Sequence, residues 1–388
     1  MHTAHLTRPL GLSAAAVGLG LAVTAGLTGV AGATPTPPPP PHALFVQTDA
    51  PTGNQILAYQ RGSDGTISLA GTYASGGDGA VASGAHADPL ASQGSLTLAL
   101  GGQVLLAVNA GSDSVSVFTV DGTQLTLTQT LGSEGPFPSS IAVHGPWVEV
   151  LDAGGAGKVA EFKFTGDHLA AVAGEARSLG LGNVAPVPNF LASPGQVGFT
   201  PAGSQVIVTT KASTKVTSSY EVLSVSPSGV LGASPVVTAG ATPAPFAFAF
   251  DAAGHLVATE AGASNVSTYT VNADGTLSLI GSAADGATAL CWLSVSAGVV
   301  YGSNAGSGTV STFDLSPTTG APTLANATAA TTPAGTTDSA IDPSHSFLYV
   351  QSGGAGALDV YKIGTAGSLS PVETVWNLPV ASEGLAIS

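Results

Sequence analysis

Residues 108–118 read VNAGSDSVSVF, and this stretch decides the fold because related stretches recur along the chain. It holds the end of an apolar strand, a glycine-containing turn at Ala110-Gly111-Ser112-Asp113, and a second strand in which apolar and polar residues alternate. Alternation at every second residue is typical of a half-buried β-strand. The stretch therefore predicts two antiparallel strands joined by a short turn.

Seven units of this kind follow one another, spaced by 61, 43, 58, 50, 44 and 48 residues. The first strand of each unit ends in a small or polar residue, at Thr48, Asn109, Asp152, Thr210, Glu260, Asn304 and Ser352. The second strand of each unit carries one aromatic residue, at Tyr59, Phe118, Phe162, Tyr220, Tyr269, Phe313 and Tyr361. An aromatic residue at one fixed place per unit favours packing between neighbouring sheets. A fixed period of this length is typical of a repeat architecture.

Each unit also contains two further strands, which gives four antiparallel strands per unit. Asp-Gly turns such as Asp64-Gly65 introduce the third of these strands. The first unit lacks its leading strand, whereas residues 383–388 form an extra strand-like tail that is similar to residues 139–143. A tail that completes the first sheet closes a ring. The sequence therefore predicts an all-β fold, a seven-bladed β-propeller over residues 42–388; an open β-solenoid is the alternative.

Composition excludes several classes of protein. The 52 glycines and 26 prolines are incompatible with a helical bundle, and a charged content of only 8% is unlike a disordered tail. The net charge of −15 excludes nucleic acid as a partner, because such a surface repels phosphate backbones. Cys291 is the only cysteine and lies in an apolar run, so it is expected to be a buried small hydrophobe.

The N-terminal residues predict export. Residues 1–33 combine an early Arg8, a long apolar stretch and the peptidase pattern Ala31-Gly32-Ala33, so they are read as a signal peptide cleaved after Ala33. An uncleaved membrane anchor is the alternative. Residues 34–41 form a proline-rich linker. We therefore expect a secreted protein without stable membrane insertion after cleavage, and a monomer, because a closed ring has no free sheet edge.

Two insertions lengthen the repeat, at residues 76–92 and 179–194. Insertions into a repeat map to loops, which often share one functional face; neutral surface loops are the alternative. The first insertion contains His86-Ala87-Asp88, a histidine beside a carboxylate and a candidate acid–base pair. The other histidines fall at different places in their units, so neither a metal site nor a cofactor is predicted.

The ends of the first strands supply the remaining candidates, because corresponding places in a propeller lie on one face. Glu260 is a candidate general base, and Lys211 directly follows one of these strands. Asn109, Asp152 and Asn304 are candidate substrate-binding residues. The alternative is that such side chains bond to turn N–H groups, which is the usual role of Asp and Asn in turns.

The units, with residues 108–118 as the clearest example, resemble the seven-bladed propeller lactonase family, which includes propeller-type 6-phosphogluconolactonases and fungal carboxymuconate lactonizing enzymes. The resemblance covers residues 42–388 and is nearest to a secreted actinobacterial branch. It implies a site of His, Arg and Glu on one face of the ring. Glu260 matches the family glutamate, and Gln196 stands where a histidine is expected. Lys211 lies at the place where the family has an acidic turn. No arginine follows Arg177.

These departures leave two functional hypotheses. The first is a lactonase-like enzyme that hydrolyses or isomerises a neutral lactone-type small molecule, with Glu260 as general base and Gln196, Lys211, Asn109, Asp152, Asn304 and His86 around the substrate. A phosphorylated substrate is disfavoured because anionic ligands normally meet Arg or Lys. The second is a non-catalytic propeller that binds a ligand, glycan or protein in the cell envelope.

Overall fold

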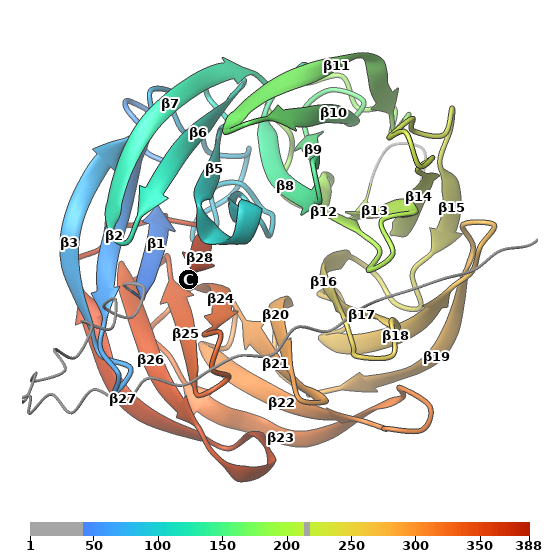
Figure 1. The fold of residues 1–388 in the computed structure, drawn as a ribbon. Helices are drawn as coiled ribbons and strands as arrows, with labels where there is room; N and C mark the ends of the chain where they lie inside the picture. Colours follow the sequence, from blue (N-terminus) through green and yellow to red (C-terminus); the bar gives the residue numbers. More distant parts are fainter. Residues whose placement is uncertain (1–41, 213–217) are drawn as a thin grey trace, which may run out of the picture. The chain divides into compact units, whose positions relative to one another are not determined.

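The structure, a computed structural model, describes residues 42–212 and 218–388. The expected signal peptide and proline-rich linker, residues 1–33 and 34–41, lie outside the described residues. Seven four-stranded antiparallel sheets are arranged in a ring (Figure 1), and its centre is the channel that is typical of a β-propeller. The predicted seven-bladed β-propeller is therefore confirmed.

Each blade contributes its first strand to the channel and its last strand to the outside of the ring. Blade 1 contains β28 (Leu385–Ile387), β1 (Ala43–Gln47), β2 (Gln55–Arg61) and β3 (Ile67–Ala74). Blade 2 contains β4 (Leu96–Ala99), β5 (Val104–Asn109), β6 (Ser114–Asp121) and β7 (Gln124–Gly132), with the short helix η1 (Leu100–Gly102). Blade 3 contains β8 (Pro138–His144), β9 (Trp147–Asp152), β10 (Lys158–Thr165) and β11 (His168–Ser178).

The second half of the ring repeats this order. Blade 4 contains β12 (Pro194–Phe199), β13 (Gln205–Thr210), β14 (Ser219–Ser224) and β15 (Val236–Ala239). Blade 5 contains β16 (Pro245–Phe250), β17 (Leu256–Glu260), β18 (Asn265–Val271) and β19 (Leu277–Ala284). Blade 6 contains β20 (Leu290–Ser296), β21 (Val299–Asn304), β22 (Thr309–Leu315) and β23 (Pro322–Thr331). Blade 7 contains β24 (Thr336–Ile341), β25 (Phe347–Ser352), β26 (Ala357–Ile363) and β27 (Leu369–Trp376), with the short helix η2 (Thr365–Gly367).

The C-terminal strand closes the ring as the sequence predicts. In β28, Ala386 pairs with Phe45 of β1, so the end of the chain supplies the inner strand of blade 1. Arg61 reinforces the closure, because it donates a hydrogen bond to the carbonyl of Ser388 and pairs with Asp342 of blade 7 at 3.6 Å. Closure leaves no unpaired inner strand in the ring.

The repeated aromatic residues form the core between the blades. All seven are buried, and they lie on the third strand of each blade, from β2 to β26. Tyr220 and Tyr269 of neighbouring blades pack edge to face with their ring centroids 5.1 Å apart. Such pairs stabilise by roughly 0.5–1.5 kcal/mol beyond the area that they bury. The predicted role of the repeated aromatic in packing between sheets is confirmed.

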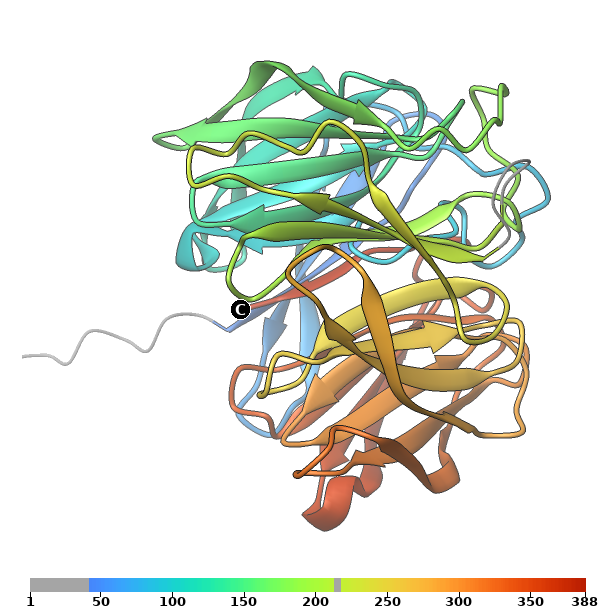
Figure 2. The same cartoon turned by 90° about the vertical axis from the view of Figure 1, so that its right-hand side faces the viewer.

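The two faces of the ring differ in the loops that they carry. We call the face on which β5 and β17 end the upper face, and the opposite one, where the C-terminus lies, the lower face. Figure 2 shows the C-terminus at the left and the long upper-face loops of blades 1 to 4 gathered at the right. In the described part of the chain no helix is both long enough and apolar enough to cross a bilayer.

Candidate functional site

The two insertions meet on the upper face. Ser83 and Asn189 form an isolated parallel bridge, in which Ser83 donates its N–H to the carbonyl of Pro188 and Phe190 donates to the carbonyl of Ser83. Segments from different repeats are therefore joined into one structure. This contact favours the interpretation that the insertions share a functional face.

Residues 88–95, which begin within the first insertion and continue just past it, lie across the upper end of the channel. Gln93 donates its N–H to the carbonyl of Gly195 in blade 4, 2.9 Å away. The indole nitrogen of Trp292 in blade 6 donates to the carbonyl of Ser92 at 2.7 Å. Glu383, just before the closing strand, accepts from the Leu90 N–H at 3.1 Å. Because these partners come from different sides of the ring, the segment covers the channel, and we call residues 88–95 the plug.

A cavity of about 290 Å³ lies beside the plug, between the second insertion and blades 4 to 6. Its walls are mostly apolar, with alanines and the large side chains of Phe190, Leu191, Phe246 and Trp292. Lys211, Asp88 and His86 are the charged or titratable polar side chains in the lining, together with Cys291. We call this cavity the Lys211 pocket. An apolar cavity with a few convergent polar groups is the usual form of a small-molecule site.

Lys211 has an unusual environment for a lysine. It is 5% exposed, and its Nζ donates hydrogen bonds to the carbonyls of Ala91, in the plug, and Pro194. Nζ also lies 4.8 Å from the centroid of the Phe246 ring. Burial lowers the pKa of Lys211 to about 8, an effect that the negative charge of Asp88 partly opposes. None of the ion pairs between described residues involves Lys211.

Four acidic side chains surround the base of the plug: Asp49, Asp88, Asp338 and Glu383. Burial raises the pKa of each, and it brings that of Asp49 to about 8. Backbone N–H groups stabilise the cluster, because Glu383 donates to Asp49 at 3.0 Å and Gly384 donates to Asp338 at 3.1 Å. The described residues contain no group of three or more His, Cys, Asp or Glu side chains placed to hold a metal ion.

Glu260 lies elsewhere, beneath the upper-face turn that precedes β16, and is fully buried. Its carboxylate accepts hydrogen bonds from six donors: the hydroxyls of Tyr220, Tyr269, Thr242 and Ser267, and the N–H groups of Ala241 and Thr242. Six donors fill the hydrogen-bonding capacity of a carboxylate, so neither oxygen is left free to accept a further proton donor. The geometry favours the alternative in which Glu260 bonds to turn groups, and its role as a general base stays a prediction.

The other strand-end residues are also buried beneath turns. Asn109 donates to Ser116 at 2.7 Å and accepts from Ser75 at 2.6 Å, while Asn304 donates to Ser311 at 2.8 Å. Asp152 is fully buried, and burial raises its pKa well above the usual value. These three residues share the upper end of their strands, as expected, but they do not line the Lys211 pocket.

Gln196 joins two blades. Its side-chain amide donates to the carbonyl of Phe248 at 3.1 Å and accepts from the Phe248 N–H at 2.7 Å, so it links β12 to β16. His86, by contrast, is exposed and lines the Lys211 pocket. The structure therefore brings together Lys211 and His86 among the predicted site residues, and separates the other five from them.

Sequence reasoning missed Phe246, Trp292 and Glu383 as parts of the site. Phe246 and Trp292 lie near the starts of the inner strands β16 and β20, where an aromatic residue is indistinguishable from ordinary core. Cys291 was expected only as a buried hydrophobe, and it is buried, but it also lines the pocket. The signal for Glu383 was its place directly before the tail that closes the ring.

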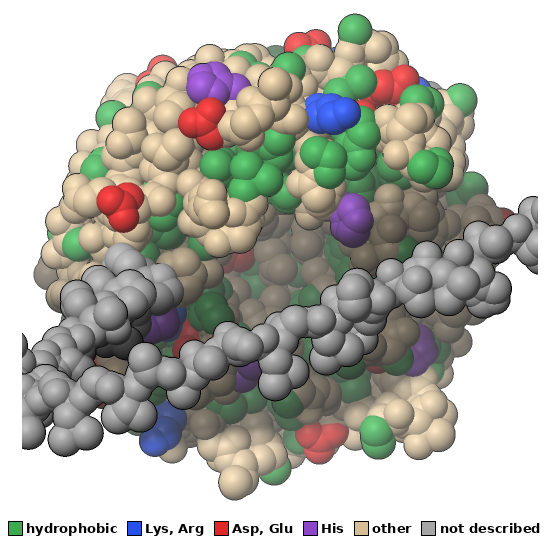
Figure 3. All heavy atoms as spheres, viewed as in Figure 1, with side chains coloured by type: hydrophobic (Ala, Val, Ile, Leu, Met, Phe, Trp, Pro, Cys, Tyr) green, Lys and Arg blue, Asp and Glu red, His purple; other side chains and the backbone are tan. Residues whose placement is uncertain are grey.

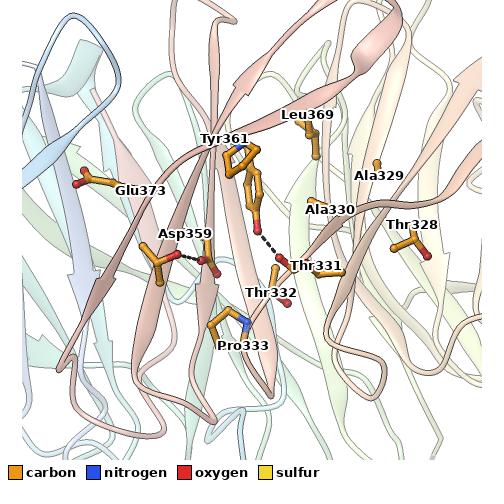
Figure 4. A pocket seen from close by; sticks show the side chains of 12 residues that line it. Thr328, Ala329, Ala330, Thr331, Thr332, Pro333, Asp359, Tyr361, Leu369 and Glu373 are labelled. Atoms are coloured by element: carbon orange, nitrogen blue, oxygen red, sulfur yellow. Dashed lines mark hydrogen bonds between the residues drawn. The ribbon is translucent and has the colours of Figure 1, made fainter.

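A larger groove of about 530 Å³ lies at the outside of the ring between blades 6 and 7 (Figure 4). Tyr361 donates to the carbonyl of Thr331 at 2.7 Å there, and Thr374 donates to Asp359 at 2.6 Å. Its lining contains no basic side chain. Figure 3 shows the lower face, on which a few charged and histidine side chains lie among mostly uncharged ones; His255 pairs with Asp251 there at 2.8 Å. The Lys211 pocket is therefore the better candidate site.

Together, these features define a class: a closed seven-bladed propeller with a small, mostly apolar pocket at the upper end of its channel. A family model described as Lactonase, 7-bladed beta-propeller, matches residues 205–382. The chain resembles this lactonase family over that range, which is a little under half of its residues. A comparison with curated proteins finds no match.

Solved structures with the same fold include several bacterial proteins. The periplasmic gluconolactonase of Pseudomonas aeruginosa is 17% identical, with a TM-score of 0.66 over 89% of this chain and 98% of its own. A Bacteroides fragilis protein, provisionally named a 6-phosphogluconolactonase, is 17% identical, with a TM-score of 0.68 over 92% and 100%. A Lactobacillus plantarum protein is 17% identical, with a TM-score of 0.67 over 90% and 99%. At this identity the likeness shows the fold alone.

Proposed function

We propose that the protein binds a small, uncharged lactone or related ester in the Lys211 pocket and opens it by hydrolysis. Lys211 carries the proposal, because it is the basic side chain in the lining of a mostly apolar cavity. The aromatic walls of Phe246 and Trp292 suit a ligand with little charge. A phosphorylated ligand would meet one lysine beside several acidic groups, so a neutral substrate is favoured.

The pocket contains a group that could stabilise the developing oxyanion and a group that could take a proton from the attacking water. The carbonyl oxygen of the substrate gains negative charge as water adds to the carbonyl carbon, and the ammonium form of Lys211 would stabilise that charge. Asp88 lines the same pocket, and burial raises its pKa, which makes its ionised form a stronger base than an ordinary aspartate. Asp88 is therefore the residue proposed to take the proton of the attacking water.

The non-catalytic propeller is the second candidate function. It is favoured by the hydrogen bonds that Lys211 and Asp88 already make to the plug backbone, to Ala91 in both cases. In that arrangement both side chains hold the plug, and the pocket serves only to bind a ligand. The same chemistry of walls and charge would then select an uncharged small molecule.

A panel of neutral lactones of increasing ring substitution separates the two functions. Hydrolysis is followed by the acid released, and binding is followed by the fluorescence of Trp292, with Trp292→Phe identifying the contribution of this residue. Lys211→Met and Asp88→Asn are expected to lower kcat/KM by roughly 10²–10³-fold. Lys362→Met on the exposed face of β26 is the matched control and should retain full activity.

Four outcomes are distinct. Hydrolysis that Lys211→Met abolishes supports the enzyme. A Trp292 fluorescence change without hydrolysis supports the binding protein. Hydrolysis that both Lys211→Met and Asp88→Asn leave intact would overturn the assignment to this pocket, as would the absence of any binding.

A further inference from the structure

The surroundings of Lys211 also affect how readily its amine reacts with carbonyl compounds. A lysine amine reacts with carbonyl carbon only in its neutral form, and lysines that form Schiff bases in proteins are desolvated in apolar pockets or lie beside another cation. Lys211 is 5% exposed, and its pocket walls include Phe246, Trp292 and Cys291. Its two Nζ hydrogen-bond partners among the described residues are neutral backbone carbonyls.

We infer that Lys211 captures small apolar aldehydes as a Schiff base, because Lys211 lines an apolar cavity and its Nζ lies near the Phe246 ring and is fixed by the carbonyls of Ala91 and Pro194 rather than by a carboxylate. The inference rests on the ligand pocket of the proposed function and does not require that lactones are turned over. The cavity of about 290 Å³ has room for a benzene-sized ring with one carbonyl substituent.

The step is balanced without a further reactant. The Nζ lone pair attacks the aldehyde carbon, so that an N–C bond forms. The C=O π bond breaks, and its electron pair moves to the oxygen, which keeps a single bond to carbon. Loss of water then gives the imine: the carbonyl oxygen leaves with two protons that the amine supplied, and a C=N bond forms. Asp88 lines the same pocket, and its raised pKa lets it hold a proton at higher pH than an ordinary aspartic acid. It can therefore relay one of the amine protons to the departing oxygen and is left in its starting protonation state.

Protonation decides how strongly Lys211 is favoured over other lysines. Because burial brings the pKa of Lys211 to about 8, its neutral fraction at pH 7.5 exceeds that of a solvated lysine on the order of 100-fold. The carboxyl groups of Asp88 and Glu383 raise this pKa, whereas burial lowers it and is the larger effect. Selective reaction at neutral pH follows.

The test uses the intact protein, benzaldehyde as the probe and cyanoborohydride to reduce any imine to a stable secondary amine. Peptide mass mapping then measures the benzyl adduct at each lysine in one sample. Lys362 and Lys163 lie on β26 and β10, have exposed side chains, and serve as internal controls. At pH 7.5 we expect Lys211 to be labelled at least 10-fold faster than either control, with saturation at high benzaldehyde.

Two further measurements keep the inference separate from the proposed function. A neutral lactone added in excess should protect Lys211 from labelling and leave Lys362 unchanged. Lys211→Met should lose the fast adduct, whereas Lys362→Met should keep it. Labelling of Lys211 no faster than that of Lys362 overturns the inference, even if lactones are hydrolysed. Fast labelling without lactone hydrolysis supports the inference and counts against the proposed enzyme.

Discussion

The hydroxyl of Tyr269 donates a hydrogen bond of 2.6 Å to Oε1 of Glu260, the residue that the sequence singled out as a general base. Tyr220 of the neighbouring blade donates to the same oxygen at 3.1 Å. Burial and the Glu260 carboxylate both raise the pKa of Tyr269, so this hydroxyl keeps its proton and acts as a donor. Glu260 thus joins two blades and the turn above them.

This relationship predicts a loss of stability when Glu260 is removed. Glu260→Ala leaves several buried donors without an acceptor, and we expect it to lower the free energy of unfolding by about 3–5 kcal/mol. Tyr269→Phe removes one donor and should cost about 1 kcal/mol. Chemical denaturation measures both. A Glu260→Ala protein with wild-type stability but no lactone hydrolysis would restore the general-base role.

A pair of buried glutamates predicts the pH dependence of stability. Glu149 and Glu161 face each other across β9 and β10, and burial raises the pKa of Glu161 to about 7 and that of Glu149 well above its usual value. Asp49 reaches about 8 for the same reason. Between pH 5 and 8 the folded protein therefore holds protons that the unfolded chain has released, so the stability falls as pH rises.

Thermal unfolding between pH 5 and 8 checks this sign: the Tm should be higher at pH 5 by several degrees. The lowered pKa of Lys211 acts only above about pH 8 and does not enter this range. Glu161→Gln is the control, because an uncharged amide should flatten part of the slope. A Tm that rises from pH 5 to pH 8 would contradict the prediction.

The turn at Gly111 predicts that replacing Gly111 by alanine lowers the stability much more than replacing Gly132. A Cβ at Gly111 would meet the carbonyl oxygen of Gly79, in the first insertion, and Gly111 donates its N–H to the carbonyl of Asp78. Gly111→Ala should destabilise the protein by roughly 2 kcal/mol or more because backbone must move. Gly132→Ala, with nothing within 4 Å of its Cβ, should be tolerated. Equal unfolding midpoints for the two variants would refute this packing.

Ring closure predicts a role for Arg61. Its guanidinium joins the last residue, Ser388, to Asp342 of blade 7 while it is itself buried. Arg61→Met leaves Asp342 without this partner, and we expect a loss of about 2–4 kcal/mol in the free energy of unfolding. Urea denaturation measures it, with Arg177→Met on the outer strand β11 for comparison. Unfolding of the Arg61 variant in two separate transitions would further indicate an opened ring.

Export is a prediction of the N-terminal sequence alone. Cleavage after Ala33 would give a mature protein that begins at Thr34. Mass spectrometry of the protein recovered outside producing cells measures the new N-terminus. Protein that keeps residues 1–33 and sediments with membranes would instead support the uncleaved anchor.

The sequence determined the propeller because its signals are local and repeated. Gly111 and Gly65 mark turns, the aromatic residue of each unit marks a buried strand, and the tail before Ser388 marks closure. Each of these expectations depends on a few neighbouring residues, so seven copies reinforce one another. The repetition cannot separate a site residue from a structural one, because Asn109, Asp152, Glu260 and Asn304 share one place in the repeat, where Glu260 accepts hydrogen bonds from turn N–H groups.

Only the tertiary structure decided where the pocket lies. Leu90 and Glu383 are hydrogen-bonded although 293 residues separate them in the chain, and Trp292 reaches the plug from the opposite half of the sequence. The insertion that forms the plug breaks the repeat, so its position over the channel follows from contacts with several blades at once. Those contacts bury Lys211 and most of the acidic cluster. Burial shifts the pKa values of these groups, and no local sequence pattern encodes it.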